Sequence, residues 1–344
     1  MSVFQRVKAC DLLTVAELET VRHPSDLWGL WCVLHAWGVI ALAMVATAYV
    51  PWIAPIALIS IGSRQLGLAI LMHDAAHGIL ARGNGLNNFL GQYLCAAPVF
   101  SDLKPYRVYH LLHHRRTQQP DDPDLALSAP FPVTRASFRR KLVRDMTGQT
   151  AYQQRKAQFA GAAKRGLVGF LNKMWPALLV NALILAGCIA AGFWWLYPAL
   201  WLLPLATWFQ LVVRVRNIAE HAIVPDNNDP FRNARTVSAN LAERMILAPY
   251  WVNYHVEHHL LFWVPCYRLP RLHALLIAKG FGPRMELRPS YADIISDATS
   301  RAHSIGGNSG ARERRRNAVF EGHQPEPRPD HAPDQSSGEN KKNA

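Results

Sequence analysis

Two long stretches without a charged side chain constrain this sequence most. The first runs from Trp28 to Ser63, 36 residues, and the second from Met174 to Val213, 40 residues; neither contains Asp, Glu, Lys or Arg. One membrane-spanning helix needs roughly 20 apolar residues, whereas a buried helix of a soluble core commonly has about 10–14. Each stretch is long enough for two spans joined by a tight turn, so we predict two helical hairpins in a membrane.

Each predicted hairpin consists of two spans joined by a turn that contains proline. The four spans cover residues 28–49, 54–72, 175–195 and 199–215. Arg64 is the one charge inside the second span. Aromatic residues that favour a membrane–water interface gather at the two turns: Trp52, Trp194, Trp195, Tyr197 and Trp201. The sequence therefore predicts an all-α integral membrane protein.

The positive charge of the chain is concentrated on one side of this topology. Charged residues make up 18% of the chain, against about 25% in soluble domains, and the net charge is +13. Residues 73–173, between the hairpins, hold many bases, and the two turns hold none. The positive-inside rule then places the termini and residues 73–173 in the cytoplasm, in a membrane that we expect to be a bacterial inner membrane. Nucleic-acid binding is not needed to explain the charge.

The chain divides into three predicted parts. Residues 1–27 form a cytoplasmic N-terminal segment, and 28–298 form the membrane domain. From Thr299 the sequence is rich in Gly, Arg, Asn, Pro, Asp and Ser, so 299–344 is predicted to be a disordered cytoplasmic tail. Helical stretches are expected near 238–248 and 268–280. The five cysteines are widely separated and form no CxxC pair, which disfavours a disulfide framework, a zinc site or an iron–sulfur site.

The 15 histidines carry the strongest functional signal. His73 and His77 form an HxxxH motif, and two HxxHH motifs follow, one at His110 and one at His255. The histidine frequency predicts about 0.03 HxxHH motifs by chance. Spacings of three and four place side chains on one face of a helix, so each motif is expected to aim its imidazoles at one point. His221, just past the last span, is a ninth candidate. The metal-ligand candidates are therefore His73, His77, His110, His113, His114, His221, His255, His258 and His259.

Nine imidazoles are too many for one metal ion. A zinc ion usually takes four ligands, so this number suits two metals with open positions. Imidazole also binds copper, nickel and iron, and ligand type alone does not choose among them. The HExxH motif of zinc peptidases is absent. The remaining histidines, His273 among them, are expected to be ordinary core or surface residues.

Carboxylates near the motifs are natural partners for the second ring nitrogen of a ligand histidine. We consider this role for each acidic side chain close to a motif, with a solvated surface charge as the alternative. These side chains belong to Asp74, Asp121, Asp122, Asp124, Glu220 and Glu257.

The order of the motifs resembles that of the membrane fatty acid desaturase superfamily. The similar segments are His73-Asp74-Ala75-Ala76-His77-Gly78, the region from His110 to the Asp121-Asp122-Pro123-Asp124 tetrad, and Asn253 to Leu260 followed by Val264 to Pro270. The resemblance covers roughly residues 28–280. It implies a di-iron centre ligated by the nine histidines, dioxygen as co-substrate and a long-chain lipid substrate. Asn217, four residues before His221, matches an asparagine that holds one iron through water in some members.

The resemblance leaves the product of the reaction open. A membrane fatty acid desaturase, which inserts a double bond into a long-chain acyl group, is our first hypothesis. The alternative is a carotenoid ketolase or hydroxylase, or another lipid hydroxylase of the superfamily. A haem electron carrier or a metal transporter is a remote alternative, because only His35 lies deep in a predicted span and the hairpins are almost uncharged. The chain shows no redox cofactor motif of its own, so we expect an external electron donor such as a ferredoxin or cytochrome.

Overall fold

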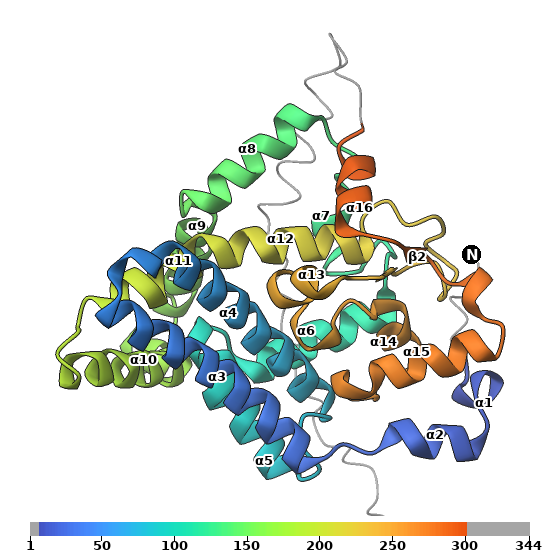
Figure 1. The fold of residues 1–344 in the computed structure, drawn as a ribbon, viewed down its shortest axis with the longest axis horizontal. Helices are drawn as coiled ribbons and strands as arrows, with labels where there is room; N and C mark the ends of the chain where they lie inside the picture. The colour runs from blue at the N-terminus through green and yellow to red at the C-terminus, as the bar shows by residue number, and fades with distance from the viewer. Residues whose placement is uncertain (1–6, 301–344) are drawn as a thin grey trace, which may run out of the picture. The chain divides into compact units, whose positions relative to one another are not determined.

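The computed structural model describes residues 7–300 of the chain (Figure 1). The predicted tail lies outside the described residues, except for Thr299 and Ser300. Within residues 7–300 the regular structure is almost entirely helical, and the two strands, β1 (Thr236–Val237) and β2 (Leu287–Arg288), form one short parallel pair. The predicted all-α class is confirmed.

The first hairpin consists of α3 (Asp26–Tyr49), the short turn η1 (Pro51–Ile53) and α4 (Ala54–His77). The apolar length and the turn agree with the prediction, but α4 continues five residues past 72. It ends where Gly78 adopts a left-handed conformation, with φ of 77°, which a glycine accepts without steric cost. The extension matters because it places His73 and His77 on the last turn of a rigid helix.

The second hairpin consists of α10 (Gly166–Ala190) and a helical segment from Tyr197 to His221. The third span was expected at 175–195, but α10 starts nine residues earlier and closes at Ala190, where the Phe193 amide bonds to the Cys188 carbonyl at 2.9 Å. The last segment comprises η4 (Tyr197–Leu202), α11 (Leu203–Ala206) and α12 (Trp208–His221). It extends six residues beyond the predicted end at 215 and carries His221.

These four helices are long and apolar enough to cross a membrane. They differ in how deeply they are buried within the protein. The most apolar part of the α4 span is 56% buried, whereas that of α10 is 22% buried and leaves Leu183 and Ile189 exposed. An exposed apolar helix suits contact with lipid tails. α4 packs against α3, α6 (Leu103–Arg116) and α12, so it forms the centre of the structure.

The rest of the described chain forms a helical cap around the ends of α4 and α12 (Figure 1). Its other helices of four or more residues are α1 (Ala9–Leu12), α2 (Val15–Arg22), α5 (Asn84–Phe89), η2 (Leu90–Ala96), α7 (Leu125–Ser128), α8 (Arg135–Met146), α9 (Gln149–Ala163), α13 (Leu241–Ile246), α14 (His255–Leu260), α15 (Leu269–Ala278) and α16 (Tyr291–Ala298). Three-residue turns complete it: η3 (Ala97–Val99), η5 (Pro249–Trp251), η6 (Cys266–Arg268) and η7 (Gly282–Arg284). The predicted helices near 238–248 and 268–280 correspond to α13 and α15.

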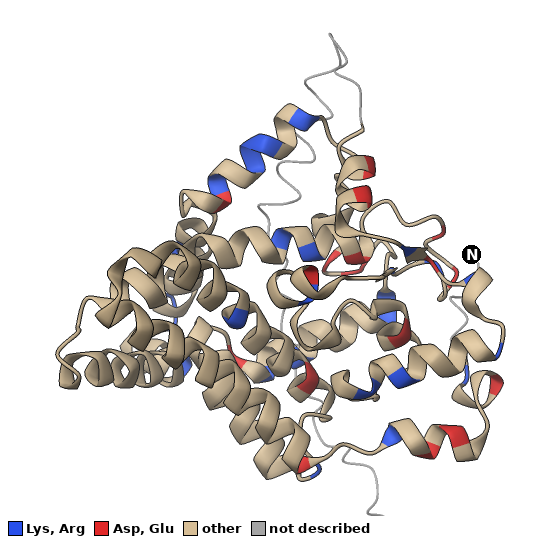
Figure 2. Cartoon of the chain, in the orientation of Figure 1, with Lys and Arg blue, Asp and Glu red and all other residues tan. Residues whose placement is uncertain are grey.

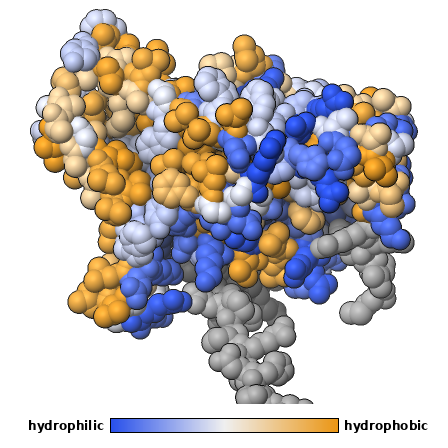
Figure 3. Space-filling model, turned by 90° about the horizontal axis from the view of Figure 1, so that it is seen from below, coloured by the Kyte–Doolittle hydropathy of each residue, from blue (hydrophilic) through white to orange (hydrophobic). Residues whose placement is uncertain are grey.

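Charge and hydropathy separate the hairpins from the cap. Figure 2 shows few charged residues on α3, α10 and α11, and a row of basic residues on α8. In Figure 3, hydrophobic surface gathers toward one end of the visible face and hydrophilic surface toward the other. A buried ion pair joins the two parts, because Arg214 on α12 donates from Nη2 to Asp145 of α8 at 2.8 Å. Two membrane hairpins with a helical cap thus match the predicted fold, with the two HxxHH motifs in the cap and the HxxxH motif at the end of α4.

Candidate metal centre

Five of the nine candidate histidines form one buried group, here called the five-histidine cluster. His73 and His77 come from α4, His110 and His114 from α6, and His258 from α14. One ring nitrogen of each lies within 4.8 Å of the corresponding nitrogens of the others. Three helices that are distant in sequence therefore aim imidazoles at one small volume.

The contacts inside the five-histidine cluster fit a bound cation. The Nε2 atom of His110 lies 3.0 Å from that of His77 and 2.9 Å from that of His114, and the Nε2 atom of His258 lies 3.0 Å from that of His114. The Nε2 atom of His73 is buried without a hydrogen-bond partner in the described structure. A neutral imidazole has only one N–H, so such a convergence of ring nitrogens leaves lone pairs facing one another. A metal ion at their centre would satisfy them.

Burial keeps these imidazoles in the form that binds metals. For His110, His114 and His258, removal from water lowers the pKa well below the usual value, and the neighbouring imidazoles lower it further. A histidine must be neutral to donate a lone pair to a metal ion. The cluster is therefore prepared for a cation without having to lose protons near neutral pH.

The other four candidates meet beside a carboxylate, and this group is called the mixed cluster. It consists of two overlapping groups that share His221 of α12: His113 of α6 with His221 and His259, and Glu220 of α12 with His221 and His255. The Nε2 atom of His255 lies 2.9 Å from that of His221 and 3.1 Å from that of His259. Glu220 Oε2 is 3.6 Å from His255 Nε2. Imidazole and carboxylate together suit iron among other transition metals.

The structure corrects one expectation about the HxxHH motifs. Each motif was expected to aim at a single point, but each one divides between the two clusters. On α6, the i,i+4 pair His110 and His114 joins the five-histidine cluster, whereas His113 joins the mixed cluster. On α14 the i,i+4 pair joins the mixed cluster and His258 crosses to the other. The two histidines four residues apart lie closest to the same helix face. The histidine between them, three residues after the first, is rotated away from that face.

Two of the predicted carboxylate partners contact candidate ligands directly. Asp122 Oδ1 lies 2.8 Å from His113 Nδ1, and Asp74 Oδ1 lies 3.4 Å from His73 Nδ1. Burial lowers the pKa of His113, but the hydrogen bond to Asp122 and the charges of Asp124 and Glu220 outweigh it and raise that pKa overall. Such partners orient the ring so that Nε2 faces the metal.

The other acidic residues have different partners. Asp124 Oδ2 is 3.6 Å from His113 Nδ1, whereas Asp121 is exposed and pairs with Arg116. Glu257 contacts Thr236 and His273. His273, expected to be an ordinary residue, thus helps hold α14 through this buried carboxylate.

Backbone and hydroxyl groups hold two further rings. His221 Nδ1 is 3.2 Å from the Asn233 carbonyl, and His259 Nδ1 is 3.3 Å from Thr117 Oγ1. Neither contact was predicted from the sequence: Asn233 lies outside the motifs, and Thr117, although it belongs to the segment from His110 to Asp124, was given no partner. The ring orientations are therefore set by groups from several parts of the cap.

A cavity of about 230 Å³ opens beside both clusters. His110 of the five-histidine cluster and His113, Glu220, His221 and His255 of the mixed cluster line part of its wall. The rest of the lining includes the apolar side chains Leu66, Ala69, Met72, Leu127, Phe209 and Val213. Asn217 also lines the cavity, together with Glu220 and His221 of the mixed cluster. Its role through a bound water stays a prediction.

An ion pair next to the mixed cluster was not anticipated. Arg216 Nε donates to Glu220 Oε1 at 2.6 Å, and both side chains are largely buried. The signal in the sequence is the i,i+4 spacing of an arginine and a glutamate at the end of an apolar span. This pair holds Glu220 at the mixed cluster, where its second oxygen faces His255.

Similarity to known proteins agrees with this geometry. Residues 49–286 match the family described as fatty acid desaturase, which is more than half of the chain. The chain belongs to this family. The resemblance of the three histidine motifs is thereby confirmed, and the match covers α4, the second hairpin and both clusters, whereas α3 precedes it.

Relatives in this family differ in the reactions for which they are named. A dihydrorhizobitoxine desaturase from Bradyrhizobium elkanii is 30% identical over 305 residues, covering 80% of each chain. An sn-1 oleoyl-lipid 12-desaturase from Synechocystis sp. is 23% identical and covers 82% of this chain and 84% of its own. A beta-carotene ketolase from Paracoccus sp. is 25% identical and covers 70% and 86%. The similarity establishes an oxidoreductase family and leaves the substrate open.

Proposed function

We propose that this protein is a membrane desaturase that holds two iron ions and uses dioxygen to introduce a double bond into a long-chain acyl lipid. The observation that carries the proposal is the cavity of about 230 Å³ whose wall combines apolar side chains with histidines of both clusters. A cavity of this kind suits a hydrocarbon segment beside two metals. The desaturase relatives and the family match support the same reaction type.

Each cluster would hold one iron ion. The five-histidine cluster would use His73, His77, His110, His114 and His258, and the mixed cluster would use His113, His221, His255, His259 and Glu220. Bound iron would supply the redox chemistry with dioxygen that removal of hydrogen from an unactivated methylene requires. Asn217 is proposed to bind water at the cavity wall beside the mixed cluster.

The protein's own residues would position the substrate and exclude water. The apolar lining, including Phe209 and Val213, would hold a methylene segment against the histidines. Asp122 and the Asn233 carbonyl would fix His113 and His221 so that their Nε2 atoms face the centre. The ligand side chains are buried or nearly so, which limits access of bulk water to the reacting carbon.

Electrons would come from a separate protein. Each of the five cysteines is a free thiol, and four of them are buried. The basic residues of α8, including Arg139, Arg140 and Arg144, would attract an acidic ferredoxin or a cytochrome (Figure 2). We also propose that the cap faces the cytoplasm of a bacterial inner membrane, as the distribution of basic residues indicates.

Mass-spectrometric profiling of cells with and without the chain tests the proposed reaction. Lipids, pigments and polar metabolites are compared, with His258→Ala as the control. An acyl lipid lighter by two hydrogens in wild-type cells alone supports an acyl-lipid desaturase. A small metabolite lighter by two hydrogens keeps desaturation but contradicts the proposed substrate class.

A carotenoid ketolase is the second candidate function. It is favoured by the similarity to beta-carotene ketolases from two Paracoccus strains, at 23% and 25% identity, each over 86% of the relative. In the same experiment, a pigment heavier by one oxygen and lighter by two hydrogens would support ketolation and contradict acyl desaturation.

A further inference from the structure

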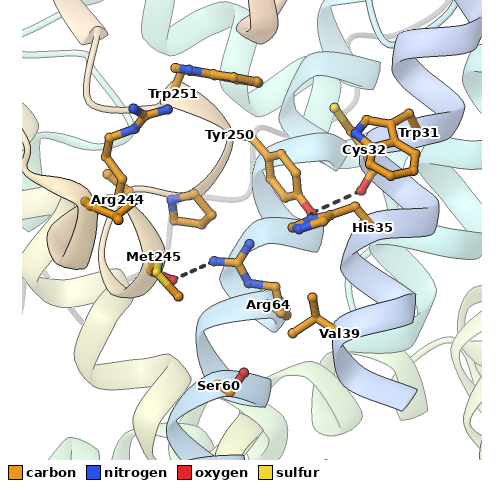
Figure 4. Close-up of a pocket in the computed structure, with 13 residues that line it drawn as sticks. Trp31, Cys32, His35, Val39, Ser60, Arg64, Arg244, Met245, Tyr250 and Trp251 are labelled. Atoms are coloured by element: carbon orange, nitrogen blue, oxygen red, sulfur yellow. Dashed lines mark hydrogen bonds between the residues drawn. The ribbon is translucent and has the colours of Figure 1, made fainter. Parts of the chain in front are cut away.

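A second and larger cavity, of about 390 Å³, lies between α3, α4 and the α13–η5 segment (Figure 4). Its lining shares no residue with the cavity beside the histidine clusters. The lining contains two arginines and no aspartate or glutamate. Nothing in the proposed reaction uses this cavity.

Arg64 is the charge that most needs explanation. It sits inside the second span with 8% of its surface exposed. Its Nη2 atom donates to the Met245 carbonyl at 2.5 Å, and its guanidinium lies 5.7 Å from the centre of the Tyr250 ring. Between residues 7 and 300, no carboxylate lies within ion-pair distance of it. A buried cation within a membrane span without a counter-ion is costly and marks a functional site.

A second cation lines the same cavity from the other side. Arg244 on α13 is exposed and lies over the Trp251 ring, 5.9 Å from its centre. It too forms no ion pair with any residue that the structure describes. Figure 4 shows Arg64 and Arg244 on either side of the Tyr250–Trp251 corner. Both arginines therefore place positive charge on the wall of the cavity.

The Tyr250–Trp251 corner between the two arginines has a strained backbone conformation. Tyr250 and Trp251 have φ angles of 53° and 58°, a conformation that bulky residues rarely adopt and that tends to occur at binding sites. Gly67 on α4 permits it, because an added Cβ there would lie 2.7 Å from Tyr250 Cε2. The Tyr250 hydroxyl donates to the Cys32 carbonyl at 3.0 Å and lies 3.1 Å from His35 Nδ1. These contacts fix the corner against both spans.

Much of the remaining surface of the cavity is apolar and exposed. Trp31, Leu241 and Met245 line it and are exposed, and Leu34 and Leu42 continue an exposed apolar surface along α3. Tryptophan and arginine beside apolar side chains are typical of the region where lipid head groups meet acyl chains. A ligand that satisfies the cavity must combine an anion with a hydrocarbon chain.

We propose that this cavity binds an anionic phospholipid, with its phosphate between Arg64 and Arg244 and an acyl chain along α3. Guanidinium groups recognise phosphate through charge-assisted hydrogen bonds. The lipid supplies the counter-ion that the described residues do not provide for Arg64. This site is separate from the histidine clusters, so a test of lipid binding here does not depend on the proposed reaction.

Native mass spectrometry of the full chain in detergent tests the site, with phosphatidylglycerol as the probe. We expect one tightly retained lipid, with affinity about tenfold weaker in Arg64→Gln and about threefold weaker in Arg244→Gln. The matched control is Arg139→Gln, which removes an exposed arginine of α8 and should leave binding unchanged. Because Arg244 is exposed, its variant should fold even if Arg64→Gln does not.

Three outcomes would overturn the proposal. Equal retention by wild type and Arg244→Gln would show that the arginines hold no phosphate. Equal affinity for zwitterionic phosphatidylcholine would show that negative charge is not recognised. Displacement of phosphatidylglycerol by stoichiometric oleate would identify a carboxylate ligand instead of a phospholipid.

Discussion

The two histidine clusters use neighbouring side chains of the same helices, yet they differ in ligand chemistry. The five-histidine cluster contains imidazoles alone, whereas the mixed cluster adds Glu220 and the buried Arg216 behind it. They also differ in access. Only His110 of the five-histidine cluster lines the cavity of about 230 Å³, against four members of the mixed cluster. A separate cavity of about 210 Å³ meets one histidine of each cluster, His114 and His259.

This difference indicates that the two clusters have different roles. Five converging imidazoles leave little room for other ligands, so the five-histidine cluster suits tight and permanent binding of its metal. The mixed cluster has fewer imidazoles, a carboxylate and an open wall, which suits entry of a reactant. Since α6 and α14 each contribute to both clusters, one cluster cannot move without the other.

Removal of one histidine from either cluster should have the largest effect. In His258→Ala the five-histidine cluster loses a ligand, and in His113→Ala the mixed cluster does. Product formation should fall at least about 100-fold in both, while iron per chain, measured by mass spectrometry of the purified protein, falls from about two toward one in each. His23→Ala, an exposed histidine, is the control. Full activity in either cluster variant would contradict the ligand assignment.

Glu220→Gln should separate the clusters. The substitution removes the carboxylate from the mixed cluster and leaves Arg216 buried without its partner. We expect about 10- to 100-fold weaker iron binding at the mixed cluster alone, and a loss of about 3 kcal/mol in the free energy of unfolding. Iron titration and thermal unfolding measure the two effects.

The double variant Arg216→Met with Glu220→Gln shows which part of the effect is structural. Removal of the unpaired cation should restore part of the stability, because an apolar side chain replaces a buried charge. Iron binding at the mixed cluster should stay weak. Recovery of iron binding would show that Glu220 acts only through the ion pair.

Asp122→Asn compares the supports of the two clusters. Asp122 lies 2.8 Å from His113, and it also accepts the Gln118 amide at 2.7 Å. Asp74, which supports His73 in the five-histidine cluster, is 3.4 Å from its ring. We expect Asp122→Asn to weaken iron binding about tenfold and Asp74→Asn to weaken it less. Equal losses would indicate that the distance from carboxylate to ring does not matter here.

The spans were largely predictable because an apolar run of that length has few alternatives. The end of the fourth span was placed too early, because the charge-free run ends at Val213, just before Arg214 and Arg216. The fold instead neutralises them with Asp145 from α8 and Glu220 one turn later. The pair of Arg214 with Asp145 depends on packing between α12 and α8, which local composition does not reveal.

The candidate ligands were predictable from spacing, but their division was not. Motif spacing relates side chains on one helix, whereas the partition of each HxxHH depends on how α6 and α14 face each other. For the same reason Glu220 was considered only as a supporting residue. Its place among the ligands follows from the approach of α14 to the end of α12, which brings its carboxylate 3.6 Å from His255.

Asp121→Asn should have the smallest effect and makes the comparison with Asp122 sharper. The two residues are adjacent in the same acidic tetrad, and both were candidates to support a ligand. Asp121 pairs with Arg116 at 3.1 Å, but both side chains are more than half exposed. Water and salt screen such a pair, so unfolding free energy should change by less than about 0.5 kcal/mol, with no change in iron per chain. A loss of iron comparable with that in Asp122→Asn would mean that the tetrad acts through its total charge. No loss would mean that the contact with His113 is what matters.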